Sequence, residues 1–174
     1  MWQYHPVLLL FQLGTFISLG IAGYSLYRLR TYGWRVVEGT VGLFAFHNAI
    51  WNLAATAKSA STVLETKLLM YKLEFLGSAV TPTLALLLAL AYLGYDRWLT
   101  LRVVGGLTLV SAGTVVLITV NPSQAMIVDP ELVRASGIWT FEHAFPPLFT
   151  TYLAWALGTA LTAGLLVAHG AFAG

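Results

Sequence analysis

An uncharged run of residues, 75–95, constrains the fold of this chain more than any other feature. At ~1.5 Å per residue, a helix of this length covers roughly 30 Å, which is the thickness of the hydrocarbon core of a bilayer. The run begins after Lys72 and Glu74, contains Pro82 and ends before Asp96. A soluble protein would rarely bury such a run on every face. The sequence therefore predicts a transmembrane helix with ionisable residues near one end.

The composition places the whole chain in the membrane class. Its 174 residues are 58% hydrophobic and only 9% charged, whereas soluble domains carry about 25% charged residues. Nine Lys/Arg and seven Asp/Glu give a net charge of +2. The basic residues are scattered, so we expect no nucleic-acid partner, which would require a clustered basic face. The absence of cysteine excludes disulfides, thiolate metal sites and cysteine nucleophiles.

We predict an all-α fold, a multi-pass transmembrane helical bundle that forms a single domain over residues 1–174. The first stretch lacks the basic region of a cleaved signal peptide, so we interpret it as a retained span. Asp129, Pro130 and Glu131 are typical of a helix start and predict a short surface helix, 130–135, within the 121–146 loop. The five expected spans are about 7–29, 35–57, 66–95, 100–120 and 147–169.

Two local features predict how these spans bend and pack. Pro82 removes a backbone donor and predicts a kink near Ser78, with the hydroxyl of Ser78 or Thr81 satisfying the freed carbonyl. Small residues at spacing four predict faces of close helix approach. These faces are Gly14, Ser18 and Ala22 in the first span, and Ala156, Ala160, Gly164 and Ala168 in the fifth.

Polar residues in the second and third spans suggest an intramembrane cluster of Glu74, Asn48, Asn52 and His47. Counting residues from the helix ends places Glu74 and Asn52 at similar depth, with the other two one turn deeper. One interpretation is a ligand-binding or proton-sensing pocket. The other is structural: the asparagines join the two spans by hydrogen bonds, while Glu74 is protonated or reaches the interface.

We expect neither a cofactor nor an enzymatic activity. A bis-histidine haem needs two histidines at one depth, but His47 lies near mid-membrane, while His5 and His143 lie near one surface and His169 near the other. The sequence lacks a His-Glu-x-x-His zinc motif, an activated serine arrangement and a phosphate loop.

Several short motifs resemble the seven-helix N-terminal sensor region of membrane histidine kinases, a module abundant in archaea. The third span resembles that of this family at LEFLG (73–77), Pro82, AYLG (91–94) and RWLT (97–100). The turn from Val120 to Gln124 is similar to the family's Thr-Asn-Pro-x-His turn, but its Val and Gln replace the Thr and His. The resemblance implies a sensor module. The family has seven spans where we count five, and no kinase core follows, so we expect the front of a sensor or a free-standing relative.

Two functions remain open. The first is a membrane sensory or signal-transducing module that resembles the input region of a histidine kinase. The alternative is a structural or accessory subunit of a multi-protein membrane complex. In both, the chain lies in the bilayer of the cell membrane and acts with a protein partner or as a homo-oligomer within the membrane. Arginines cluster at 28–35 and 97–102, so we expect the N-terminus outside and the C-terminus in the cytoplasm.

Overall fold

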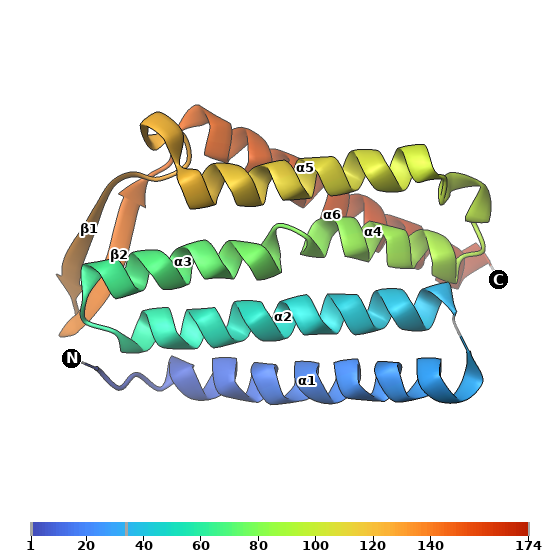
Figure 1. The fold of residues 1–174 in the computed structure, drawn as a ribbon, viewed down its shortest axis with the longest axis horizontal. Helices are drawn as coiled ribbons and strands as arrows, with labels where there is room; N and C mark the ends of the chain where they lie inside the picture. The colour runs from blue at the N-terminus through green and yellow to red at the C-terminus, as the bar shows by residue number, and fades with distance from the viewer. Residues whose placement is uncertain (1, 34, 174) are drawn as a thin grey trace.

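The structure, a computed structural model, describes residues 2–33 and 35–173. Figure 1 shows α1, α2, the α3–α4 pair and α5 side by side, with α6 behind α4 and α5. The strands lie across the end of the bundle that also holds the N-terminus, and the C-terminus lies at the opposite end. We call the end that holds the strands and the N-terminus the hairpin end. The elements in the described residues are α1 (Val7–Tyr32), α2 (Val36–Ala60), α3 (Leu64–Ser78), α4 (Thr81–Tyr92), α5 (Leu101–Val120), β1 (Val128–Ala135), β2 (Ile138–Ala144) and α6 (Pro147–Ala173).

The predicted helical membrane class is confirmed, although the span count agrees only in part. Within the described residues, four helical segments are long and apolar enough to cross a membrane: Val7–Tyr32, Leu64–Tyr92, Leu101–Val120 and Pro147–Phe172. The remaining helix, α2, has 25 residues but is more polar. It lies between α1 and the α3–α4 pair (Figure 1). Its length and position favour a fifth crossing, which stays a prediction.

The central span breaks where Pro82 predicts a kink. Helix α3 ends at Ser78 and α4 begins at Thr81, so the predicted helix 66–95 is two helices joined at Ala79 and Val80. The Thr81 hydroxyl donates to the carbonyl of Gly77 at 2.9 Å. This bond satisfies a carbonyl beside the break, as membrane helices require.

Glycines set the spacing between neighbouring helices. A Cβ added at Gly77 would lie 2.5 Å from the carbonyl oxygen of His47 and 2.7 Å from the main-chain nitrogen of Trp51, so α3 touches the backbone of α2. A Cβ added at Gly14 would lie 2.8 Å from Oδ1 of Asn52. Gly14 therefore lies on the face of α1 that packs on α2, as its small-residue spacing predicts.

Replacing Gly77 by alanine is expected to lower the free energy of unfolding by about 1–3 kcal/mol, because two backbones must separate to admit the methyl group. Titration with SDS in detergent micelles would measure this change. Gly113→Ala on α5 is the matched control, since its added Cβ meets nothing within 4 Å. Equal stabilities of the two variants would show that the contact between α2 and α3 relaxes freely.

The face that α6 uses differs from the predicted one. Ala156 is half-buried, but Ala160 and Gly164 are exposed, while Thr159 and Ala163 are buried. Alternating spacings of three and four keep residues on one side of a helix, whereas a strict spacing of four drifts around it. Of the predicted small-residue face, only the first residue, Ala156, packs against other parts of the protein. Ala160 and Gly164 instead line an apolar groove between α2, α4 and α6.

The predicted surface helix over 130–135 is wrong, because this segment is strand β1 of an antiparallel hairpin. Ser136 and Gly137 connect the strands with φ of 51° and 81°, the pair of positive values that a two-residue type I′ turn requires. Pro130 lies within the register irregularity of β1, between Val128 and Glu131. A proline without an N–H is tolerated at such a bulge.

A hydrophobic core cluster joins the helices to the loop before the hairpin. It consists of buried side chains from α3, the α3–α4 link, α5, α6 and the loop before β1: Phe75, Ala79, Ile118, Met126, Ile127 and Phe149. Asn121 fixes this loop. Its Oδ1 accepts hydrogen bonds from the main-chain N–H groups of Met126 (2.9 Å) and Ile127 (3.0 Å), and its Nδ2 donates to the carbonyl of Ile127 at 2.8 Å. The core thus holds the hairpin over the helix ends.

Candidate functional site

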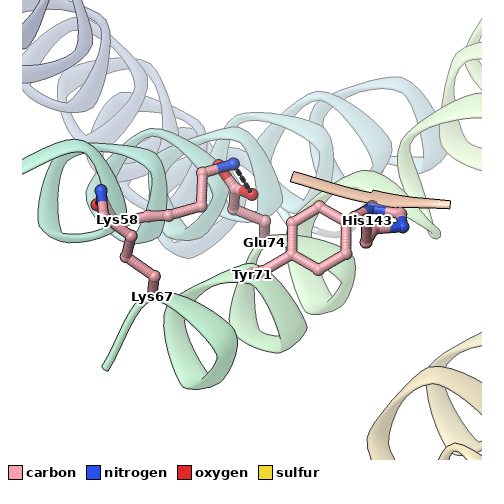
Figure 2. Close-up of polar contacts among 5 residues, drawn as sticks. All are labelled: Lys58, Lys67, Tyr71, Glu74 and His143. Carbon is pink, nitrogen blue, oxygen red and sulfur yellow. Dashed lines mark hydrogen bonds and ion pairs between the residues drawn. The ribbon is translucent and has the colours of Figure 1, made fainter. Parts of the chain in front are cut away.

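A buried ion pair lies at the hairpin end, where α2 meets α3. Nζ of Lys58, near the end of α2, donates to Oε2 of Glu74 on α3 (Figure 2). The Glu74 side chain is 7% exposed and that of Lys58 is 24% exposed. The same ammonium group lies 5.1 Å from the centre of the Tyr71 ring. Lys58 therefore compensates the carboxylate and contacts the aromatic face one turn away.

Tyr71 joins this ion pair to the hairpin. Its hydroxyl and Nε2 of His143, on β2, are 2.7 Å apart. Nδ1 of His143 lies 2.9 Å from the carbonyl oxygen of Ala144 and donates to it, because a carbonyl only accepts. In the neutral ring Nε2 is then the acceptor, and the Tyr71 hydroxyl donates. Figure 2 shows His143 reaching toward Tyr71 from the strand.

Lys67 completes what we call the hairpin-end cluster: Lys58, Lys67, Tyr71, Glu74 and His143. Its side chain is 2% exposed, and Nζ donates to the main-chain carbonyl of Lys58 at 2.8 Å. The described residues place no carboxylate within ion-pairing distance of this ammonium group. Lys67 is therefore a buried cation with a neutral partner.

Gln3 ties the N-terminal segment to both sides of this cluster. Its Nε2 donates to the carbonyls of Ser59 (2.9 Å) and Trp139 (2.8 Å), and its Oε1 accepts from the N–H of Trp139 at 2.8 Å. Its main-chain N–H donates to the carbonyl of Ala60 at 2.7 Å. One side chain thus joins the end of α2 to β2.

The structure does not gather the four residues predicted as a polar cluster. Nδ2 of Asn48 donates to the carbonyl of Phe44, Nδ2 of Asn52 donates to that of Asn48, and Nδ1 of His47 donates to that of Leu43. These bonds stay within α2, and the one from Asn52 lies on the side of α1. Within the described part of the chain, no hydrogen bond or ion pair joins them to Glu74.

The sequence reasoning therefore identified Glu74 and missed its partners. It estimated depth from backbone positions, whereas the long stem of Lys58 reaches back along α2 to the carboxylate. His143 was placed near the same surface, but no pattern on a helix links it to Tyr71. The signal for that pairing was the Ser136-Gly137 turn, which predicts a hairpin and brings β2 over α3.

The contacts of this cluster connect three elements of the fold: α2, α3 and β2. In the described residues, no three histidine or acidic side chains are grouped to hold a metal ion. What the cluster supplies is a chain of polar contacts from the end of α2 through α3 to β2. A movement of the hairpin therefore changes the surroundings of a buried ion pair.

Comparison with known proteins identifies a family to which the chain is similar. The family model of the N-terminal seven-transmembrane region of histidine kinases matches residues 10–174, nearly the whole chain and all six helices in part or in full. No curated protein and no solved structure matches the chain. The matched range includes every residue of the hairpin-end cluster, while Gln3 lies before it. With its apolar helices of membrane-spanning length, the chain belongs to the family of histidine kinase N-terminal seven-transmembrane regions.

Proposed function

We propose that this chain is a sensory, signal-transducing module of the cell membrane that controls a histidine kinase. The observation that carries this proposal is the family match over residues 10–174. The module contributes no catalytic step of its own. It lies in the lipid bilayer and passes its signal to a protein partner or to a second copy of itself within the membrane.

The hairpin-end cluster supports this function because it links a surface element to the interior of the bundle. The hairpin is the described part of the chain that lies across the helix ends (Figure 1). Tyr71 connects it by one hydrogen bond to the helix that carries Glu74. A stimulus that shifts the hairpin changes the position of α3 relative to α2, and such helix shifts are a common route of signalling.

We also propose that the hairpin end faces outward. Arg28, near the end of α1, and the connections that contain Arg35 and Arg97 lie at the opposite end of the bundle (Figure 1). Lys/Arg residues are enriched on the cytoplasmic side of membrane proteins. Two of these arginines form ion pairs with Oε1 of Glu38: a guanidinium nitrogen of Arg28 lies 3.4 Å from it, and one of Arg35 lies 3.7 Å from it. In this orientation the N-terminus is outside and the C-terminus cytoplasmic.

Tyr71→Phe is expected to change the unstimulated autophosphorylation of the kinase severalfold. The substitution removes one hydrogen bond, worth about 1 kcal/mol, and that energy shifts a two-state equilibrium by about fivefold. The kinase to assay is the one that is continuous with the chain or co-purifies with it from native membranes. Radioactive phosphate incorporation in those membranes measures the change.

Tyr152→Phe is the matched control. Tyr152 is half-buried on α6 beside Phe75, and its hydroxyl has no hydrogen-bond partner among the described residues. Its loss should leave phosphorylation unchanged. If both variants behave like the wild type, and the chain co-purifies with an energy-converting or transport complex instead of a kinase, the accessory-subunit function replaces the sensory one.

A further inference from the structure

A cavity of about 420 Å³ lies between the N-terminal segment, the end of α2 and the hairpin. This volume is within the range of small-molecule sites, roughly 300–1,000 Å³. The residues around it that matter for binding come from four separate segments: Gln3, His5, Lys58, Lys67, Trp139 and Phe141. An occupant would therefore touch the hairpin and two helices at once.

The charge around this cavity is unbalanced. Lys58 and Glu74 neutralise one another, which leaves the ammonium group of Lys67 as the second cation on the wall. Lys67 is 2% exposed and has a single main-chain carbonyl as its hydrogen-bond acceptor, so two of its three N–H groups have no acceptor among the described residues. A buried charge is costly unless an opposite charge compensates it. The described residues supply no such charge, and an anion in the cavity would.

The rest of the wall suits an apolar group. Trp139 and Phe141, on β2, line the same cavity as Lys67. His5 also lines the cavity, and its Nδ1 accepts a hydrogen bond from the N–H of Val7 at 3.1 Å, so in the neutral ring Nε2 carries the hydrogen. The cavity thus combines a buried cation, a second polar donor and an aromatic wall.

We propose that this cavity binds a carboxylate that carries an apolar group, with its oxyanion on Lys67 and its apolar part against Trp139 and Phe141. That this ligand is the stimulus rests on the proposed sensory function, whereas binding itself does not. The same chemistry occurs in a soluble organic acid and in a fatty acid that enters from the bilayer.

The test is isothermal titration of the full chain, in an uncharged detergent, with octanoate and with octanamide. Octanoate should bind, and octanamide should bind at least about tenfold more weakly, because a hydrogen bond to a charged group is worth ~1.5–3 kcal/mol. Lys67→Met should lower the octanoate affinity by a similar factor. Lys72→Met is the matched control, since Lys72 lies on the same helix and its Nζ donates to Thr119 outside the cavity.

Trp139→Ala provides a second variant that keeps the contacts of Gln3, because these use only the main chain of Trp139. It should weaken octanoate and octanamide alike. Competition by palmitate in phosphatidylcholine nanodiscs would identify the bilayer as the source, and octanoate binding without such competition would identify a soluble acid. Equal affinities for octanoate and octanamide, or an unchanged affinity in Lys67→Met, would overturn the proposal. The titration contains no kinase, so its result is independent of the phosphorylation assay.

Discussion

Lys58→Met is expected to lower the free energy of unfolding by about 3–5 kcal/mol, the cost of removing one partner of a buried ion pair. The carboxylate that it leaves behind belongs to Glu74, whose side chain is 7% exposed and accepts its hydrogen bond from Lys58. Methionine keeps most of the apolar stem, so the loss arises from the charge. Titration with SDS in micelles measures it.

The double variant Lys58→Met/Glu74→Gln separates this effect from simple loss of packing. Because it removes both charges, it should be less destabilised than the sum of the two single variants. Lys72→Met again serves as the control, since Lys72 donates to a carbonyl at an exposed position and forms no ion pair among the described residues. Strict additivity of the two changes would contradict the ion pair.

Asn121→Ala is expected to lower the free energy of unfolding by roughly 2–6 kcal/mol. Two buried N–H groups lose their acceptor, and each such loss costs ~1–3 kcal/mol. Met126 and Ile127, which carry these groups, are each 1% exposed. Alanine is also unfavourable at the φ of 48° that residue 121 adopts, whereas asparagine tolerates it. The change should appear both in SDS unfolding and in faster proteolysis of the hairpin.

Two substitutions in the same loop make this prediction specific. Asn121→Asp keeps the acceptor for both N–H groups and loses only the donor to Ile127, so it should be less harmful than alanine. Gln124→Ala removes an exposed amide whose Oε1 accepts from Asp129 at 3.4 Å and should change stability by less than ~0.5 kcal/mol. A comparable loss of stability in Gln124→Ala would show that the effect of Asn121→Ala does not come from the hydrogen bonds of Asn121.

The helices were predictable from the sequence because each depends on a long local signal. Uncharged runs of membrane length mark α1, α5 and α6, and Pro82 marks the break between α3 and α4. The small residues of α1 also marked its contact with α2. Lipid allows few alternatives to the helix, so these signals are not overridden by distant contacts.

The hairpin was missed because two local signals compete within a short segment. Asp129 and Pro130 are typical of a helix start, but the Ser136-Gly137 turn and the β-branched and aromatic residues of β2 favour strands. Pairing with β2 decides the conformation of β1, since a helix of six residues has little stability of its own. Proline then occupies the bulge instead of a first helical turn.

The candidate site was only partly predictable because its residues meet through side-chain reach and chain topology. Glu74 was conspicuous as a carboxylate in an apolar span. Its partner Lys58 resembles any lysine at a helix end, and the pairing of Tyr71 with His143 depends on the hairpin. The asparagines of α2 share a helix face, but each bonds to its own helix, which one-dimensional spacing does not reveal.

The position of Gln3 also affects how the protein should be handled. An affinity tag fused ahead of the first residue would begin two residues from the side chain that joins α2 to β2. Such a fusion would add chain close to Gln3 and His5, both of which line the cavity, so binding experiments are better made without it. The carboxyl end, on the far side of the bundle (Figure 1), is the better place for purification handles and fluorescent reporters.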